Sequence, residues 1–255
     1  MTADTGRRHT LRLLAGSATA TLLTGCDRLS GTEWFPRLLR VGETLSRGTQ
    51  TLLTSRRSMA QEFTERDLSP DFRSNGTSQP EGELYRALAA GGFASWQLQV
   101  EGLVAQPQAF SLAALQSMPS RTQITRHDCV EGWSAIGKWK GVPLARVLEL
   151  VRPKSDARYI VFHCADAMDD AGTLYYESID LEDANHPQTI LAYELNDMPL
   201  PVKNGAPLRL RVERQLGYKH AKYLMRLELV ASFAHLGHGK GGYWEDDGYE
   251  WYAGI

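Results

Sequence analysis

Cysteine, long apolar runs and an excess of charge of one sign are all scarce in this chain of 255 residues. Its 28 Lys and Arg nearly balance 30 Asp and Glu, and the net charge of −2 excludes the broad basic surface that non-specific nucleic-acid binding requires. Three cysteines are too few for a disulfide framework. No Cys-x-x-Cys-His motif occurs and no Gly-x-Gly-x-x-Gly motif follows a predicted strand, so neither a covalent c-type haem nor a Rossmann dinucleotide site is indicated. With 42% hydrophobic and 23% charged residues, the composition is that of an ordinary globular protein.

The N-terminal segment differs in kind from the rest. Arg7 and Arg8 precede an uncharged run, residues 13–25, which is shorter than the ~20 residues that a membrane-spanning helix needs. The pattern predicts an export signal that resembles the twin-arginine type, with Thr10 at a position usually held by an aromatic residue. The Leu-Thr-Gly-Cys segment that ends at Cys26 resembles a bacterial lipobox, which predicts cleavage before Cys26, a lipid on its thiol and a periplasmic location. The alternative is a Sec-type or uncleaved segment in which Cys26 is incidental.

The chain after the signal divides into a helical segment, a β-rich domain and a tail. The predicted signal peptide covers residues 1–25. Apolar residues at helical spacing then predict an N-terminal helical segment over 26–69. Hydrophobic periods of two predict a catalytic domain rich in strands over 70–232, and residues 233–255 form a tail dense in aromatic and acidic residues. Because strands and helices mix without a βαβ rhythm, the predicted fold class is α+β, mostly β with peripheral helices.

Local patterns predict the individual elements of the domain. Ser111 before apolar residues at helical spacing predicts a capped helix that stops at Pro119, and Pro143 marks the first turn of another helix. Alternating or continuous apolar residues predict strands at 96–101, 124–127, 159–162, 173–176, 208–213 and 225–229.

Cys129 follows a predicted strand and stands next to charged residues. Arg126 and His127 place cations beside the thiol that favour the thiolate, which is the form that attacks substrates and binds metals. In an oxidising compartment Cys129 and Cys164 pair as a disulfide, stay inert or bind a metal. Two further alternatives stay open, a zinc site built from His127, Cys129 and the His163-Cys164 pair, and a cysteine hydrolase.

Two ordered blocks of residues resemble the sulfite oxidase family of molybdopterin-dependent oxidoreductases. The first block, 128–134 with 139–144, resembles the molybdenum-ligating segment of that family. The second block runs from His186-Pro187 through 203–210 to 217–222. The resemblance covers roughly the predicted catalytic domain, and the bacterial periplasmic methionine sulfoxide reductase catalytic subunits are the branch that it resembles most.

The resemblance implies a sulfite-oxidase-type molybdopterin-binding fold with a molybdenum on one pyranopterin dithiolene. Cys129 is then the single protein ligand of the metal, and a soft thiolate suits a metal that changes its oxidation state by two electrons. Arg126 and His127 are the nearest candidates for orienting an oxyanion substrate. The implied cofactor-binding residues are Asn75, Cys164, Asn204, Arg209, His220, Ala221 and Lys222, with Arg209 and Lys222 as the cations that bind the phosphate.

Several of these residues also have a plain structural interpretation. Asn75-Gly76 and Asn204-Gly205 are turn signals, and Arg209 fits the solvated face of a strand. Cys164 stands where the most similar branch has a threonine that contacts the cofactor, and it fits a packed small residue equally well.

The implied activity is a two-electron oxygen-atom transfer. Similarity to the shorter, single-domain branch favours reduction of a sulfoxide or a related S-oxide or N-oxide, with electrons from a membrane haem protein or a c-type cytochrome. Sulfite oxidation uses the same metal cycle in the opposite sense and stays open. So does a non-enzymatic lipoprotein that keeps the fold as a binding module, because a fold does not fix a function.

The expected assembly is a monomer that touches the membrane only through its lipid anchor and binds no nucleic acid. This expectation arises because the chain ends without the extra C-terminal domain through which sulfite oxidases commonly dimerise. Three roles are open for the tail, 233–255: it caps the mouth of the active site, docks a redox partner or covers a sheet edge.

Overall fold

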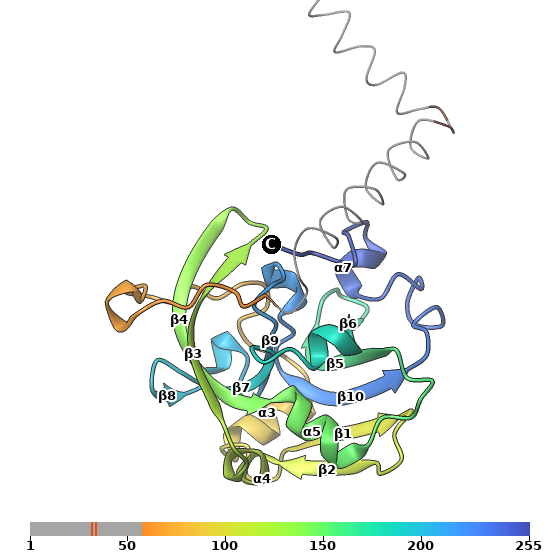
Figure 1. Cartoon of the computed structure of the whole chain (residues 1–255), viewed down its shortest axis with the longest axis horizontal. Coiled ribbons are helices and arrows are strands. Elements are labelled where there is room, and N and C mark those ends of the chain that lie inside the picture. The colour runs from red at the N-terminus through yellow and green to blue at the C-terminus, as the bar shows by residue number, and fades with distance from the viewer. Residues whose placement is uncertain (1–31, 33, 35–57) are drawn as a thin grey trace, which may run out of the picture. The chain divides into compact units, whose positions relative to one another are not determined.

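The computed structural model describes residues 32, 34 and 58–255 (Figure 1). The chain divides into two units, Met1–Arg56 and Arg57–Ile255, and the fold described below is that of the second unit. The predicted export signal and Cys26 lie outside the described residues. Within the described part, none of the helices combines the length and the apolar character that a membrane crossing requires.

The helix predicted over 26–69 is wrong in the part that the structure describes, and its earlier part lies outside the described residues. Residues 58–69 are extended except for one 3-10 helix, Glu65–Asp67. Glu62 forms an antiparallel β-bridge with Thr125 of the neighbouring strand. The amide of Phe63 donates to the carbonyl of Ile124 over 2.8 Å and that of Ser69 to the carbonyl of Ile136 over 3.0 Å, so these backbone groups are satisfied without a helix.

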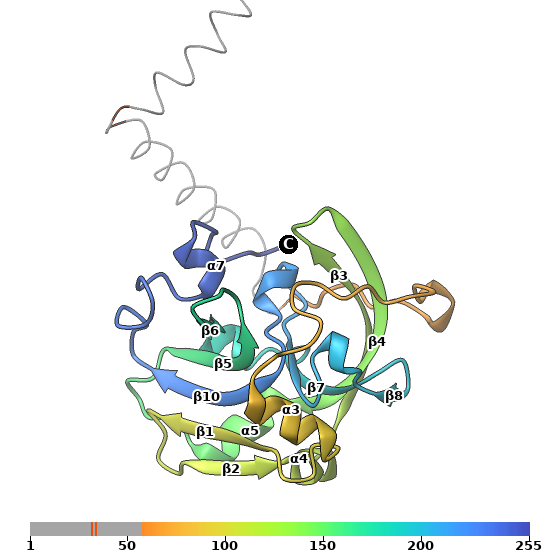
Figure 2. The ribbon, with the colours of Figure 1, turned by 180° about the vertical axis from the view of Figure 1, so that it is seen from behind.

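The first sheet has five strands in the order β2-β1-β10-β5-β6 (Figures 1 and 2). Its strands are β1 (Gln97–Gly102), β2 (Gln108–Ser111), β5 (Tyr159–Ala167), β6 (Leu174–Asp180) and β10 (Leu224–Val230). β1 and β10 are parallel, with Val100 opposite Leu227, and the other neighbours are antiparallel. The last strand of the chain therefore lies in the centre of the sheet, where it joins β1–β2 to β5–β6.

The second sheet has the strand order β3-β4-β7-β8, and β9 also pairs with β7. Its strands are β3 (Arg121–Cys129), β4 (Trp133–Pro143), β7 (Ile190–Leu195), β8 (Met198–Pro199) and β9 (Arg209–Arg211). β3 and β4 form a long hairpin in which Cys129 pairs with Trp133 at the tip. Gly132 takes φ +85° in this turn, a conformation that glycine adopts without strain.

Short helices connect the strands of the described domain. They are α3 (Glu83–Ala90), α4 (Leu112–Ser117), α5 (Leu144–Val151), α6 (Leu181–Ala184) and α7 (Tyr243–Asp246). The cap predicted at Ser111 is confirmed, since its side chain accepts a hydrogen bond from the amide of Ala114 over 3.1 Å. Pro143 lies one residue before α5 rather than in its first turn.

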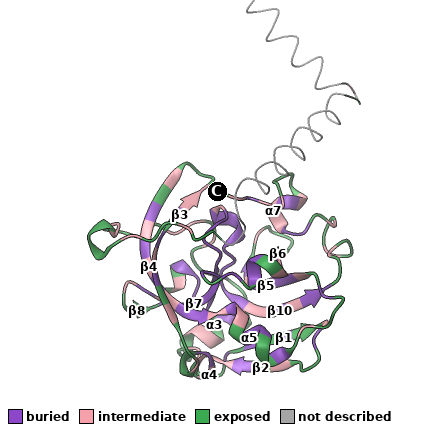
Figure 3. Ribbon diagram, in the orientation of Figure 1, coloured by how far each residue is buried: buried purple, intermediate pink, exposed green. Residues whose placement is uncertain are grey.

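The main hydrophobic core is made by both sheets. Leu98 and Phe162 of the first sheet and Leu191 and Leu210 of the second are fully buried in one cluster. Burying side chains of this size contributes about 1.5–3 kcal/mol each. Figure 3 shows buried stretches on strands of both sheets, with exposed residues gathered on loops and helices. The predicted α+β fold, mostly β with peripheral helices, is confirmed.

The strand predicted at 208–213 exists, but its charged residues are not solvated. β9 is buried throughout, and Arg209 and Arg211 are both 0% exposed. Their guanidinium groups lie 5.0 and 4.4 Å from the ring centroid of Trp139. The interpretation of Arg209 as the solvated face of a strand is therefore wrong, because the ring of Trp139 lies against both guanidinium groups.

Gly141 of β4 lies where the backbones of β4 and β7 approach too closely for a side chain. A Cβ at this position would come within 2.2 Å of the carbonyl oxygen of Leu191 and 2.6 Å of the Cα of Ala192. We predict that Gly141→Ala lowers the free energy of unfolding by about 1–3 kcal/mol, because the strands must move apart. Urea unfolding followed by circular dichroism measures the change. Gly91→Ala, whose Cβ would meet its nearest atoms at 3.6 Å, is the matched control and should cost less than about 0.5 kcal/mol; equal losses in the two variants would contradict this account.

Candidate active site

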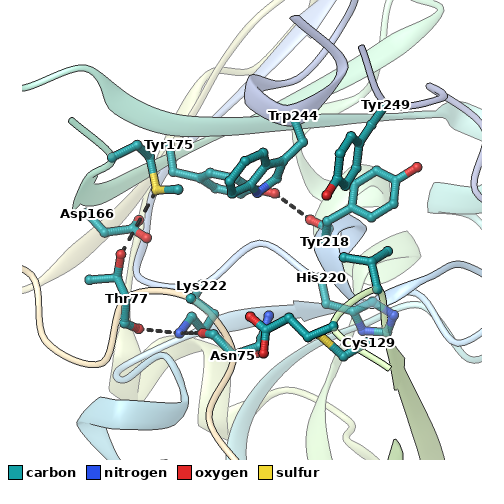
Figure 4. Close-up of a pocket in the computed structure, with 14 residues that line it drawn as sticks. Asn75, Thr77, Cys129, Asp166, Tyr175, Tyr218, His220, Lys222, Trp244 and Tyr249 are labelled. Carbon is teal, nitrogen blue, oxygen red and sulfur yellow. Dashed lines mark hydrogen bonds between the residues drawn. The ribbon is translucent and has the colours of Figure 1, made fainter. Parts of the chain in front are cut away.

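A pocket of about 180 Å³ opens beside Cys129 at the tip of the β3–β4 hairpin (Figure 4). Segments far apart in the sequence meet there. The lining residues are Asn75, Gly76, Thr77, Cys129, Val130, Glu131, Asp166, Met168, Tyr175, Tyr218, His220, Lys222, Trp244 and Tyr249. Both sheets and the C-terminal tail therefore contribute to one cavity.

The Cys129 thiol is half-buried at the edge of this pocket. Burial raises the pKa of the Cys129 thiol above its ordinary value, and the backbone amide of Glu131 and the charge of Arg73 only partly oppose this effect. The thiol of the cofactor-free protein is therefore protonated at neutral pH, and a metal ion has to displace that proton to bind.

Arg126 and His127 do not flank the thiol as the sequence led us to expect. Neighbouring side chains of a strand point to opposite faces, so Arg126 is exposed away from the pocket, where it pairs with Asp128 over 2.9 Å. His127 is 1% exposed and does not line the pocket. Burial and the charge of Arg211 lower the pKa of His127 well below its ordinary value, so the imidazole is neutral. Neither residue provides the expected cation beside the sulfur, and Arg126 is not placed to orient a substrate.

His220 lines the pocket and lies against His127, with ring centroids 5.0 Å apart. The Nε2 atom of His220 donates to the carbonyl of Gln215 over 3.0 Å, which leaves Nδ1 as a buried acceptor without a partner. Burial and Arg211 lower the pKa of His220 well below its ordinary value. The ring is therefore neutral, and its buried Nδ1 atom keeps an unused lone pair.

Lys222 fastens the loop of Asn75 and Thr77 to the pocket. Its Nζ atom donates to the carbonyl of Asn75 over 2.5 Å and to the carbonyl of Thr77. Burial, and then the charge of Arg209, lower the pKa of Lys222 to about 7. The predicted cofactor-binding residues Asn75, His220 and Lys222 thus meet at one cavity, although they are up to 147 residues apart in the chain.

Arg209 and Asn204 lie behind the pocket rather than in its wall. Arg209 donates to the carbonyls of Asn204 over 2.9 Å and of His220 over 3.3 Å, and its Nε atom has no partner. Burial, and then Arg211, lower the pKa of Arg209 to about 9. The carbonyl of Ala221 accepts from the amide of Leu210 over 2.8 Å. Arg209 therefore holds the loop that carries His220 and Lys222.

Cys164 is packed in the core and does not line the pocket. It is 2% exposed, its thiol lies 4.0 Å from the carbonyl oxygen of Phe162, and burial raises its pKa well above the ordinary value. Cys129 and Cys164 are both free thiols, so the disulfide alternative is wrong. Among residues 32, 34 and 58–255 no three His, Cys, Asp or Glu side chains are placed to hold a metal ion together, which leaves the zinc alternative without support.

Sequence reasoning missed Asp166 and the aromatic wall of the pocket. Asp166 is 4% exposed, its Oδ1 atom has no partner, and burial raises its pKa to about 6. Tyr175 and Tyr218 line the same cavity, as do Trp244 and Tyr249 of the tail. The sequence signals for these residues were the density of aromatic residues in the tail and the position of Tyr218 within the block 217–222.

Comparison with known proteins identifies the family. The model of the family described as the oxidoreductase molybdopterin binding domain matches residues 88–235, and the chain belongs to this family. The family membership confirms the resemblance and the fold class inferred from the sequence, and it implies molybdopterin-bound molybdenum as the cofactor.

Related proteins carry sulfoxide reductase names. A protein of Azospira oryzae, the "putative protein-methionine-sulfoxide reductase subunit YedZ1", is 46% identical over 161 residues, which cover 63% of this chain and 56% of the relative. The "protein-methionine-sulfoxide reductase catalytic subunit MsrP" of Ralstonia nicotianae is 39% identical over 144 residues, 53% of this chain and 44% of the relative. The chain thus spans about half the length of the curated relatives it matches. The crystal structure of the sulfane dehydrogenase SoxCD from Paracoccus pantotrophus covers 55% of this chain and 39% of that chain, at 22% identity and a TM-score of 0.49.

The groups around the pocket fit a molybdopterin. A pterin presents N–H donors, ring acceptors and a phosphate, so its site needs acceptors, donors and cations together. Asn75 Oδ1, Asp166 Oδ1 and His220 Nδ1 are buried acceptors without partners in residues that line the pocket. Arg209 and Lys222 are buried cations whose hydrogen bonds go to backbone carbonyls. A bound anion would lower the cost of burying these two positive charges.

Lys222 gives the cofactor-free protein a pH-dependent stability. Its pKa of about 7 in the folded chain lies below the ordinary 10.5, so the unfolded chain holds the proton more tightly between these values. The contribution of Lys222 to stability therefore rises with pH from about 7 to 10.5, by up to ~1.4 kcal/mol per pH unit. We predict that urea unfolding of the cofactor-free protein shows this gain between about pH 7 and pH 9 in wild type and loses it in Lys222→Met. Lys154→Met, at an exposed lysine, is the control, and a gain that persists in Lys222→Met would contradict the assignment.

Proposed function

We propose that this chain is a molybdenum-dependent catalytic subunit that reduces a sulfoxide, or a related neutral S-oxide or N-oxide. In the balanced reaction, a sulfoxide takes up two electrons and two protons, its S–O bond breaks, and a thioether and one water molecule form. When bound, the molybdopterin supplies the two-electron oxygen-atom transfer. Family membership and the names of the relatives support the proposal.

The observation that carries the choice of substrate is the charge of the pocket beside Cys129. Among its lining residues, Lys222 is the one Lys or Arg, and it is the cation assigned to the phosphate of the cofactor. Glu131 and Asp166 place carboxyl groups in the same lining. These carboxyl groups would repel an anion such as sulfite, whereas a neutral S-oxide carries no net charge for them to repel. The electrostatics thus support sulfoxide reduction over sulfite oxidation.

Different residues would bind different parts of the cofactor. Cys129 is the thiolate that would hold the metal at the tip of the hairpin, where the half-buried sulfur is open to the pocket. Arg209 and Lys222 are the cations suited to the phosphate, and Asn75, Asp166 and His220 offer acceptors to N–H groups of the ring. Because His127 and His220 are both neutral, they add no charge that would change with small shifts in pH.

We also propose that the protein works in the periplasm as a monomer. The paired Arg7 and Arg8 support export by the twin-arginine route, which carries folded proteins and so allows the cofactor to be inserted first. Cys26 is the proposed lipid attachment point. The two electrons then come from a membrane haem protein or a c-type cytochrome, since a lipid anchor keeps the enzyme close to the membrane.

The test is an assay of both reaction directions on protein produced with molybdate and a complete pterin pathway. We predict turnover of methionine sulfoxide with reduced viologen and no comparable turnover of sulfite with ferricyanide. Cys129→Ala should lose activity more than about 100-fold while its circular dichroism stays that of wild type, because it removes the predicted metal ligand. Cys164→Ala, which removes the buried thiol away from the pocket, is the matched control and should keep activity. Fast sulfite oxidation would reverse the proposed direction, and protein without molybdenum or turnover would favour a binding module.

Lipid attachment has its own test. We predict that the wild-type protein partitions with membranes and that Cys26→Ala releases it, because stable attachment takes more than one acyl chain and lipoprotein modification supplies several. The released protein should stay active, since Cys129 lies over a hundred residues downstream. Cell fractionation with immunoblotting measures the distribution. Wild-type protein found entirely in the soluble periplasmic fraction would end the lipobox interpretation.

A further inference from the structure

The pocket beside Cys129 is completed by residues that lie outside the matched family segment. That segment ends at residue 235, whereas Trp244 and Tyr249 of the tail line the pocket. Figure 4 shows their rings, with that of Tyr218, on the side of the pocket away from Asn75 and Lys222. Asn75 and Lys222 therefore lie across the cavity from Trp244 and Tyr249 (Figure 4).

The aromatic residues form a continuous wall. The rings of Trp244 and Tyr249 are stacked, with centroids 5.5 Å apart and 27° between their planes, and Tyr249 meets Tyr218 edge-on at 5.2 Å. The hydroxyl of Tyr218 donates to the carbonyl of Glu250 over 2.6 Å, and that of Tyr175 donates to the carbonyl of Tyr218 over 2.5 Å. Since backbone carbonyls accept the hydroxyl protons of Tyr218 and Tyr175, these two rings contribute mainly carbon surface to the pocket.

A buried ion cluster holds this wall in place. Glu245, the residue after Trp244, is 0% exposed and lies 2.6 Å from the ammonium group of Lys219. Lys219 also contacts Glu177 of β6 over 2.5 Å. Breaking a buried pair of this kind leaves an uncompensated charge, so the tail cannot leave the domain without a large cost. Lys219 lies next to Tyr218 and His220, so the same cluster positions the wall and the cofactor loop together.

We propose that Trp244 and Tyr249 are specificity-determining residues, which bind the alkyl groups of a neutral S-oxide substrate against their ring faces. The polar S–O bond of a sulfoxide polarises the neighbouring C–H groups, so their hydrogens carry partial positive charge, and the faces of aromatic rings carry partial negative charge. Sulfite has no alkyl group and is negatively charged, so the same faces do not favour it. This inference rests on the proposed function and extends it from the reaction to the choice of substrate.

The test separates substrate binding from catalysis and from cofactor loading. Tyr249 is 41% exposed, so Tyr249→Leu should fold, and Tyr249→Phe keeps the ring. On the molybdenum-loaded protein, Tyr249→Leu should raise the KM for dimethyl sulfoxide roughly tenfold and leave kcat within about twofold. Tyr249→Phe should recover most of the affinity. Asp247→Asn, an exposed change in the same tail outside the pocket lining, is the matched control and should behave as wild type.

A readout without turnover accompanies these assays. Dimethyl sulfone keeps the two methyl groups and the polar S–O bonds, and its equilibrium binding is followed by calorimetry. Tyr249→Leu should weaken its binding by the same factor as the KM changes, with unchanged molybdenum content per chain. Loss of molybdenum in Tyr249→Leu or wild-type affinity for the sulfone would each overturn the proposal. Because the sulfone measurement needs no reaction, it tests the wall even if sulfoxide turnover is absent.

Discussion

Two buried arginines against one tryptophan ring organise the region beneath the pocket. Arg209 and Arg211 of β9 are both 0% exposed and lie on the ring of Trp139 in β4. Arg211 has its countercharge in Glu213, whose carboxylate it meets over 2.5 Å, and it donates to Nδ1 of His127. Arg209 has hydrogen bonds only to backbone carbonyls among those the structure shows, so its charge is the one that an incoming anion would compensate. The short strand β9 thus has two roles. Its arginines pack on Trp139, and Arg209 provides a buried charge that is suited to a phosphate.

The unpaired polar groups around the pocket are best explained by a ligand. Buried polar groups in folded proteins are nearly always hydrogen-bonded, because each one left without a partner costs about 1–3 kcal/mol. Asn75, Asp166 and His220 each present a buried acceptor of this kind at the same cavity. These acceptors come from three distant segments of the chain, and a bound pterin would offer N–H groups at the cavity that they share.

The tail links the cofactor loop to the mouth of the pocket. Lys219 precedes His220 in the loop, and Glu245 precedes Tyr249 in the tail, so one buried ion pair fixes both sides of the cavity. The amide of Leu216 donates to Ala253 over 2.9 Å, and the indole of Trp251 donates to Ser178 over 2.8 Å. Because the pocket needs these residues, it is complete only after the tail has been synthesised and folded. That order is compatible with the proposed insertion of the cofactor before the proposed export.

Local features of the domain could be predicted from the sequence because they depend on neighbouring residues. The alternation of apolar residues predicted the main strands, Ser111 marked a helix start, and the block around Cys129 placed the thiol at the end of a strand. Which face of that strand meets the pocket depends on how the strand packs in the folded domain. This packing turns Arg126 away from the pocket and buries His127. Contacts between distant segments likewise determine three further features. They bury Arg209, pack Cys164 in the core and leave an acceptor of Asp166 without a partner. Sequence period and motif thus determined which residues carry the chemistry, whereas tertiary contacts decided which of them face the cavity, because burial and direction are properties of the assembled sheets.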